Sequence, residues 1–399
     1  MFTEKQLDKY AEVLLWGLQK ARRKKYKKND IVAVRYNLPA LRLAEILQAR
    51  LLDQGLNPIL RLLATSVMEH TFFSKANNRQ LVFEPPGEKD LYRSLHGSIF
   101  LHAPESLTHL QHVDSTKIAK AALARKPLRD ILQKREENGD FGWTLCSYTT
   151  APLARHARLS EKQYTNQIIK ACYLNKPDPV AEWEAIFNNA REIKKWLNGM
   201  QILSYRVESK NTDLSVTHGD KRRWVGISGH NIPSFELFIS PDWRGTEGIY
   251  FANQPSYRNG NYIQDVRLEF KKGSVVNSSA KRGDDFVKKQ LRMDKGAGRL
   301  GEFSLTDIRF SKIDRFMADT LFDENYGGTS GNCHVAVGSS YSDAYAGKPA
   351  SLTKKKKEQL GFNDSALHWD LVNTETKVVT AHLKNGKNKV IYEKGKFQY

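Results

Sequence analysis

Apolar residues in the first half of the chain follow patterns that predict alternating strands and helices. The run I-V-A-V-R-Y at 31–36 predicts a short strand, and the amphipathic stretch 38–52 predicts a helix with Pro39 in its first turn. Gly55 follows where a C-terminal cap belongs, and residues 58–63 predict the next strand. Because parallel neighbours need such a crossover, this β-α-β unit predicts a parallel sheet.

The same kind of pattern continues to about residue 198. Residues 98–102 and 143–148 predict strands, and residues 114–137, 161–172 and 179–197 predict helices. Pro127 is expected to divide the first of these helices into two pieces. No G-x-G-x-x-G follows the first strand, which argues against a dinucleotide site.

Near Asn198 the helical periods give way to alternation and turn signals. Every second residue is apolar over 235–240 and 266–270, which is typical of strands. Residues 285–293 predict one helix. The Asn385-Gly386 pair indicates a hairpin turn. The second half is therefore predicted to be largely β.

Length and pattern together predict two domains in the 399 residues. We expect an α/β N-terminal domain with a parallel sheet over 1–198. A mixed α+β, mainly antiparallel, metal-binding catalytic domain is expected over 199–399.

Composition narrows the setting of the protein. No run of eighteen apolar residues occurs, so no membrane-spanning segment is expected. The polar N-terminus, residues 1–8, runs into a helical pattern and does not resemble a signal peptide. The three cysteines are scattered, which favours a reducing, cytoplasmic setting over a disulfide framework.

The net charge of +19 raises the possibility of nucleic-acid binding. The basic runs at 22–28, 221–223 and 354–357 lie far apart in sequence, as expected for solvated surface charge. Aromatic and basic residues do not cluster on one element, which makes nucleic acid an unlikely partner. A basic, non-enzymatic protein that binds nucleic acid or another partner stays open as the alternative function.

The H-W-D segment at 368–370 offers the most compact candidate for metal chemistry. Residues two apart on a strand share a face, so His368 and Asp370 point together with Trp369 on the other side. Such a pair suits hard or borderline divalent metals. The plain alternative is a solvent-facing polar pair beside a buried tryptophan.

Four further residues are weaker candidates when each is taken alone. Glu236 and Glu302 lie in predicted strands, where a single glutamate most often faces solvent. A single histidine such as His334 is more often a satisfied core residue, and Tyr341 would ordinarily be a half-buried loop tyrosine.

Several short segments, taken together, resemble the thermophilic-type metallo-aminopeptidase family. They are E-L-F-I-S-P-D at 236–242, R-L-G-E at 299–302, T-L-F-D-E-N at 320–325, H-V-A-V-G-S-S-Y at 334–341 and H-W-D at 368–370. W-T-L-C-S-Y-T-T-A-P at 143–152 resembles a segment of the family's N-terminal half. The resemblance covers most of the chain and is strongest from 236 to 370.

The resemblance implies a set of metal ligands, each of which falls on a residue of the required type. They are Glu236, Glu302, His334, His368 and Asp370. The family's tyrosine, seven residues after the first histidine, falls on Tyr341. Glu247 in G-T-E-G is a rival carboxylate, although it lacks the flanking segment that surrounds Glu236.

The resemblance also implies a function. A cytoplasmic aminopeptidase would release N-terminal residues from peptides by means of two divalent ions per subunit, which could be Zn²⁺, Co²⁺ or Mn²⁺. For the chemistry itself, Glu302 is the candidate acceptor of the attacking water's proton if it is not fully engaged as a ligand, and Tyr341 is the candidate donor of a hydrogen bond to the developing oxyanion. Peptides with a free N-terminus and a second copy of the chain are the implied partners. A member that keeps the fold but has lost catalysis is the remaining alternative.

Overall fold

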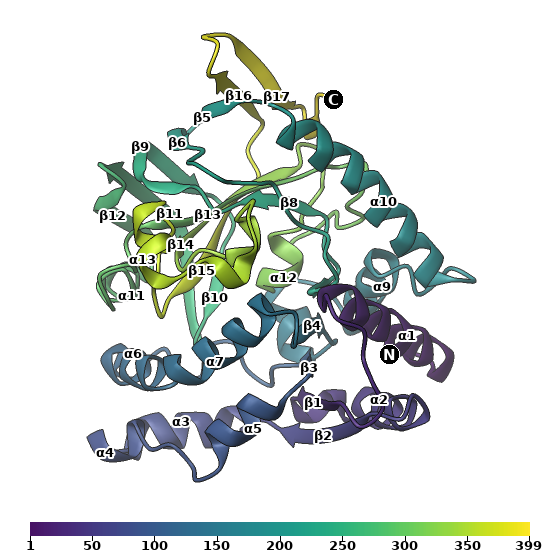
Figure 1. Cartoon of the computed structure of the whole chain (residues 1–399). Helices are drawn as coiled ribbons and strands as arrows, with labels where there is room; N and C mark the ends of the chain where they lie inside the picture. The colour runs from purple at the N-terminus through teal and green to yellow at the C-terminus, as the bar shows by residue number, and fades with distance from the viewer. The chain divides into compact units, whose positions relative to one another are not determined.

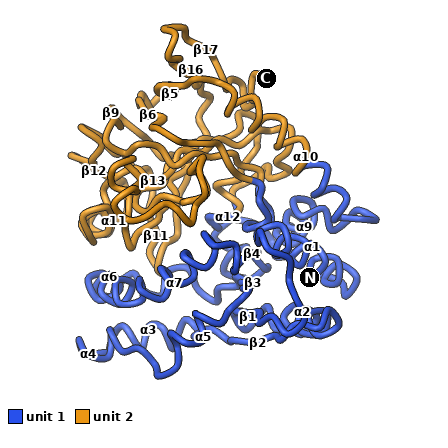
Figure 2. The backbone as a smooth tube through the Cα atoms, in the orientation of Figure 1, with its two compact units in different colours: residues 1–186, 227–234, 317–321 blue, residues 187–226, 235–316, 322–399 orange.

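The computed structural model describes residues 1–399, and the chain divides into two compact units (Figure 2). The first unit comprises residues 1–186, 227–234 and 317–321. The second comprises residues 187–226, 235–316 and 322–399. Two short segments of the second half of the sequence thus belong to the first unit, and the domain boundary expected near residue 198 stays a prediction.

A five-stranded parallel sheet forms the centre of the first unit (Figure 1). Its strand order is β2-β1-β3-β4-β7, with β1 at Ile31–Tyr36, β2 at Asn57–Leu62, β3 at Gly97–His102, β4 at Gly142–Ser147 and β7 at Asn231–Ile232. All four pairings are parallel, which confirms the parallel sheet predicted from the β-α-β pattern.

Helices make up most of the remainder of the first unit. They are α1 (Glu4–Ala21), α2 (Leu41–Asp53), α3 (Ser66–Lys75), α4 (Asn78–Leu81), α5 (Glu88–Ser94), α6 (Ser115–Ala124), α7 (Lys126–Glu137), α8 (Ala151–His156) and α9 (Glu161–Ala171), with a 3₁₀ turn η1 at Leu38–Ala40. The predicted division of the 114–137 helix is confirmed, because Pro127 lies in the first turn of α7 directly after the break at Arg125. α10 (Pro179–Asn198) leads from the first unit into the second.

The second unit is built mainly from antiparallel strands, as predicted. A nine-stranded sheet has the path β10-β11-β9-β6-β5-β16-β17-β18, with β12 paired to β11. Its strands are β5 (Ile202–Ser209), β6 (Asp213–Thr217), β9 (Asp242–Ala252), β10 (Ser256–Arg258), β11 (Asn261–Lys271), β12 (Ser274–Arg282), β16 (Lys377–Leu383), β17 (Asn388–Glu393) and β18 (Lys396–Phe397).

A separate four-stranded antiparallel sheet of the second unit has the order β15-β14-β13-β8. Its strands are β8 (Glu236–Ile239), β13 (Leu300–Thr306), β14 (Asn332–Gly338) and β15 (His368–Asn373). The helices of this unit are short, namely α11 (Asp284–Leu291), α12 (Thr320–Asp323), α13 (Lys354–Gln359) and the 3₁₀ turns η2 (Ser342–Ala344) and η3 (Pro349–Ser351).

One face of the four-stranded sheet belongs to the apolar core. Phe303 points from β13 into an aromatic cluster, with its ring centroid 5.5 Å from that of Tyr205 and 5.9 Å from that of Trp224. Because side chains alternate along a strand, Glu302 and Ser304 project from the opposite face. The core therefore fixes which face of β13 is left for polar side chains.

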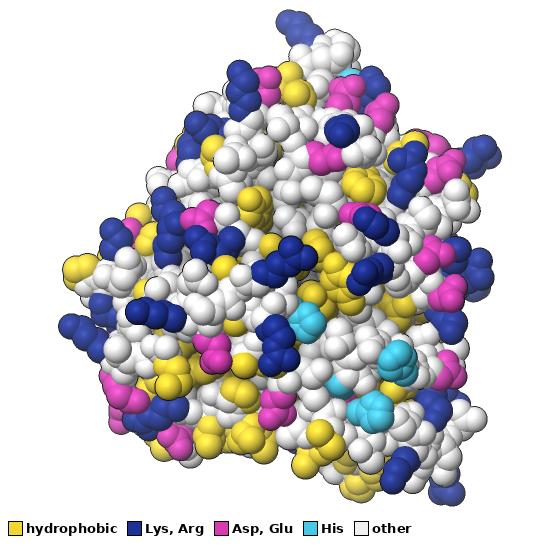
Figure 3. Space-filling model, turned by 180° about the vertical axis from the view of Figure 1, so that it is seen from behind, with side chains coloured by type: hydrophobic (Ala, Val, Ile, Leu, Met, Phe, Trp, Pro, Cys, Tyr) yellow, Lys and Arg dark blue, Asp and Glu magenta, His cyan; other side chains and the backbone are white.

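On the face seen in Figure 3, Lys and Arg side chains lie among Asp and Glu side chains. No helix combines the length and apolarity that a membrane crossing requires.

Lys377, the first residue of β16, is a buried cation whose ammonium makes no hydrogen bond. Only 2% of the residue is exposed, and its Nζ atom makes no hydrogen bond. Burial lowers the pKa of Lys377 from 10.5 to about 8. The unfolded chain therefore binds more protons than the folded chain between about pH 8 and 10.5, so the free energy of unfolding rises with pH across this window.

Replacing Lys377 by methionine is expected to stabilise the protein at pH 7 by on the order of 3 kcal/mol, since the cost of burying the ammonium disappears while the volume is kept. The gain should shrink as the pH approaches 10. Urea denaturation at pH 7 and pH 10 measures both effects, with exposed Lys387→Met as the matched control. A variant less stable than the wild type at pH 7 would show that Lys377 has a stabilising partner.

Candidate metal centre

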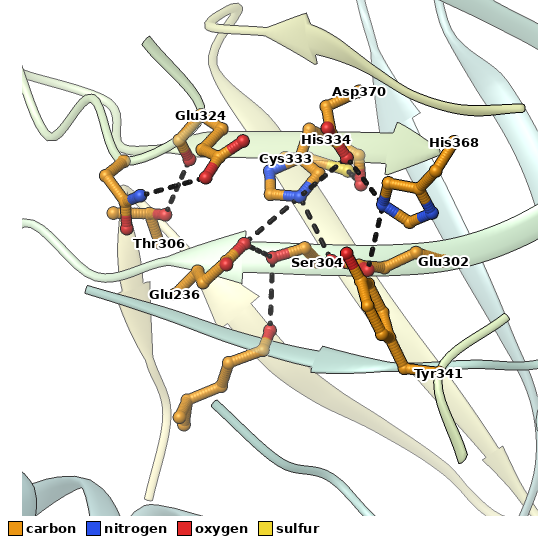
Figure 4. Close-up of polar contacts among 12 residues, drawn as sticks. Glu236, Glu302, Ser304, Thr306, Glu324, Cys333, His334, Tyr341, His368 and Asp370 are labelled. Carbon is orange, nitrogen blue, oxygen red and sulfur yellow. Dashed lines mark hydrogen bonds and ion pairs between the residues drawn. The ribbon is translucent and has the colours of Figure 1, made fainter. Parts of the chain in front are cut away.

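The polar face of the four-stranded sheet gathers the predicted site residues (Figure 4). Across the β13–β14 pair, Ser304 lies opposite His334 and Glu302 lies opposite Ala336. Antiparallel residues that lie opposite one another share a face. The next pair adds Asp370 opposite Ala336 and His368 opposite Gly338, so both residues of the H-W-D segment join the same face. The prediction that His368 and Asp370 point together is confirmed.

Glu236 reaches the cluster from the far edge of the sheet. It begins β8 and lies opposite Thr306, which is on the same face of β13 as Glu302 and Ser304. The Ser304 hydroxyl donates to Glu236 Oε2 at 2.9 Å and thereby fixes the carboxylate. Glu236 is 6% exposed and Glu302 is 3% exposed, so neither faces solvent as a single strand glutamate usually does.

His334 occupies the middle of this face, with its Nε2 atom directed at three carboxylates. Nε2 lies 3.1 Å from Glu236 Oε2, 3.2 Å from Glu302 Oε1 and 3.9 Å from Asp370 Oδ1. The residue is 1% exposed, and its Nδ1 atom has no hydrogen-bond partner. Its Nε2 atom is therefore held among carboxylates.

His368 approaches the same carboxylates from β15. Its Nε2 atom lies 3.3 Å from Asp370 Oδ1 and 3.6 Å from Glu302 Oε2. The Nδ1–H group donates to the Ser339 carbonyl at 2.8 Å, which places the lone pair of the neutral ring on Nε2. His368 is thus oriented as metal-binding histidines usually are.

The ligand atoms fall into two groups that share one residue. Glu236, Glu302 and His334 form one group, and Glu302, His368 and Asp370 form the other, with ligand atoms inside each group within 4.8 Å of one another. Between them the sheet carries small residues, since Ala336 and Gly338 occupy the intervening positions on β14. Short side chains leave room between the carboxylates for cations.

Burial and mutual repulsion perturb the protonation of this cluster. Burial raises the pKa of the Glu302 carboxyl to about 7, and the Glu236 carboxylate adds to the effect. Burial opposes the charged form of His334, but the neighbouring carboxylates, Glu236 first, outweigh it and raise the pKa of this imidazole well above its usual range. Without a bound cation, the Glu302 carboxyl and the His334 imidazole therefore tend to keep their protons.

Glu324 is a further carboxylate at this site that sequence reasoning did not identify. It is 6% exposed, and burial together with the Glu236 and Asp370 carboxylates raises its pKa well above the ordinary value. Its backbone carbonyl accepts from the Thr306 hydroxyl at 3.2 Å, which ties it to β13. The D-E-N triplet within T-L-F-D-E-N was the available signal, because that segment already belonged to the resemblance.

Tyr341 lies beside the cluster on the loop after β14. Its ring centroid is 4.7 Å from that of His368 and 5.6 Å from that of Phe238. The residue is 38% exposed. Burial of the hydroxyl end and the carboxylates near it, Glu302 foremost, raise the pKa of Tyr341 well above its usual range, so the hydroxyl remains a donor at neutral pH.

Glu247, the rival carboxylate, lies elsewhere. It is exposed on β9 of the nine-stranded sheet, and its Oε1 atom accepts from the Lys272 backbone N–H at 2.6 Å. It belongs to neither group of ligand atoms. Its surroundings are those of an ordinary surface glutamate.

The donor set fits divalent metal ions. Carboxylate oxygens with two imidazole nitrogens, and no thiolate among them, match hard or borderline cations such as Mn²⁺, Co²⁺ and Zn²⁺. Carboxylates that are buried this close to one another need a compensating positive charge, which is consistent with the raised pKa of Glu302. Metal ions would meet it and displace the retained protons.

Comparison with known proteins supplies independent information. The family described as thermophilic metalloprotease (M29) matches residues 3–397. The chain is 27% identical over 337 residues to aminopeptidase AmpS of Bacillus subtilis (strain 168), which covers 79% of this chain and 80% of that protein. It is 29% identical over 324 residues to aminopeptidase 2 of Geobacillus stearothermophilus, with 76% of each chain covered.

A solved structure shares the fold. Wild-type AmpT from Thermus thermophilus superposes with a TM-score of 0.81 and 21% sequence identity, over 99% of this chain and 100% of that chain. The architecture described above is thus that of a known protein.

Proposed function

Because this chain belongs to the thermophilic metalloprotease (M29) family, we propose that it is an aminopeptidase that uses two divalent ions to release single residues from the N-terminus of peptides. The curated relatives that carry the name aminopeptidase support the reaction. The arrangement of ligand atoms on the four-stranded sheet supports the number of ions.

The observation that carries the two-ion proposal is that two groups of three ligands share Glu302. Glu236 and His334 would hold one ion, His368 and Asp370 would hold the other, and Glu302 would serve both. This division follows the contacts, since His334 Nε2 is near Glu302 Oε1 whereas His368 Nε2 is near Glu302 Oε2. When bound, such ions polarise the scissile carbonyl and lower the pKa of the attacking water.

The side chains of the chain itself supply positioning and proton transfer. Glu302 is the proposed acceptor of the water's proton, and Glu236 and Glu324 are further buried carboxyls of the same cluster. Tyr341 donates a hydrogen bond to the oxyanion, from a loop position that contacts His368. The free amine of the substrate would bind an ion or a carboxylate, which would place the first peptide bond over the site.

Two other functions remain as alternatives. A non-enzymatic protein that binds nucleic acid or another partner would rest on the net charge of +19, but it gives no reason for buried carboxylates around two histidines. An inactive member of the family would keep the metal ligands without catalysis. The identity of the native metal, the homodimer and the cytoplasmic location stay predictions from the resemblance.

Removal of metal is expected to abolish peptidase activity, and addition of Zn²⁺, Co²⁺ or Mn²⁺ to restore it, since the water has no other activating group of comparable strength. The assay follows release of free leucine from a leucyl peptide after dialysis against a chelator. Full activity in the chelated protein would contradict the proposal. Metal binding without any turnover would favour the inactive member.

A further inference from the structure

A single loop joins the two ends of the metal centre. Residues 339–367 connect β14 to β15, and the loop carries Tyr341 near its start and reaches His368 at its end. Ser340 and Asn363 hydrogen-bond to each other in both directions at 2.9 Å, so the loop closes on itself beside the site. The loop therefore leaves the four-stranded sheet and rejoins it beside the metal centre.

A small core holds the middle of this loop in place. Ala344, Tyr345, Leu352 and Phe362 are buried together. The Arg222 guanidinium lies 3.5 Å from the centroid of the Phe362 ring and donates to the carbonyls of Ser240 and Leu360. Lys356 of α13 lies 5.0 Å from the Tyr345 ring centroid. α13 is thus fixed to the segment that carries Tyr341.

The cationic side chains presented by this region are defined here as the basic rim. They are Lys221, Arg223, Lys348 and the four lysines of α13, Lys354, Lys355, Lys356 and Lys357. Lys221 belongs with them because its backbone carbonyl accepts from the Ala346 N–H at 2.8 Å. Lys354 and Lys355 are exposed and form no ion pair, so their charge is available to a ligand.

The charge of the rim contrasts with that of the site. The loop 339–367 contains five lysines and three acidic residues, Asp343, Glu358 and Asp364. The buried floor is rich in carboxylates that would be neutralised by two divalent ions, whereas the loop outside carries two more lysines than acidic residues. A peptide whose N-terminal amine enters the site would leave its following residues near the lysines.

We propose that the basic rim selects acidic peptides, in which aspartate or glutamate follows the first few residues, and that it does so by electrostatic attraction. The inference rests on the aminopeptidase function proposed above. Fixed charges of one sign around a site raise the rate of encounter with oppositely charged ligands, and salt screens the effect. The rim should therefore act on kcat/KM much more than on kcat.

Three peptides test the proposal: Leu-Ala-Asp-Asp, Leu-Ala-Ser-Ser and Leu-Ala-Lys-Lys, each with a free N-terminus. At low salt, kcat/KM for the acidic peptide is expected to exceed that for the basic peptide about tenfold, and the ratio should fall towards one at about 0.5 M salt. The double variant K354E and K355E should remove or reverse the preference while kcat for Leu-Ala-Ser-Ser stays unchanged.

The matched control makes the same charge change outside the rim. Lys384 and Lys387 are exposed in the β16–β17 turn, and the double variant K384E and K387E should keep most of the preference. Equal kcat/KM for the three peptides at low salt would overturn the rim proposal, as would equal effects of the two double variants. Absence of turnover on all three peptides would instead count against the aminopeptidase function.

Discussion

The variant Glu302→Gln is expected to lose about 10³-fold or more in kcat/KM for a leucyl peptide, because one side chain serves both groups of ligands and is the proposed proton acceptor. The amide keeps the shape of the carboxyl but binds cations poorly and takes up no proton. Initial rates measured with saturating metal give the size of the loss.

Folding should survive this change. Burial raises the pKa of Glu302 to about 7, so removal of its charge relieves repulsion within the cluster of the metal-free protein. The unfolding midpoint of the metal-free variant is therefore expected to be no lower than that of the wild type. Glu247→Gln is the matched control, since Glu247 is exposed on β9, and it should keep full activity. Normal turnover by Glu302→Gln would remove this residue from the site.

A peptide with an acetylated N-terminus is expected to be cleaved at least about 100-fold more slowly than the same peptide with a free amine. The site is rich in carboxylates, and orientation of the first peptide bond over the activated water depends on the amine. Acetylation removes the charge and the lone pair of that amine and adds bulk where it must lie.

Mass spectrometry of the two peptides after incubation with metal-loaded protein measures the difference. The free peptide should lose residues one at a time from its N-terminus, whereas its acetylated counterpart should stay intact. Equal cleavage of the two, or cuts within the chain, would contradict the aminopeptidase function and leave a less specific metal-dependent hydrolase.

Local patterns were enough to predict much of the fold. The strand at 31–36 and the division of the 114–137 helix follow from apolar periodicity and from Pro127, and the structure has both. That His368 and Asp370 share one face of their strand follows from the two-residue period of a strand alone. No pattern predicted the helices between residues 66 and 94, because α3 buries only Phe73 and α5 buries no residue, so an apolar face is almost absent.

The composition of the site depended on information that a local pattern lacks. Glu236 and Glu302 are ordinary strand glutamates until β8, β13 and β14 pair in register, and register joins residues far apart in sequence. The resemblance supplied this long-range information for five ligands but not for Glu324. That residue reaches the cluster from the end of α12, where no strand period applies.

The central claim, that Glu302 is shared by two ions, is tested most directly by the metal content of the purified protein. Native mass spectrometry after loading with Zn²⁺ should find two ions per chain in the wild type and in Glu247→Gln, and fewer than two in Glu302→Gln. One ion or none in the wild type, or two ions retained by Glu302→Gln, would contradict the claim.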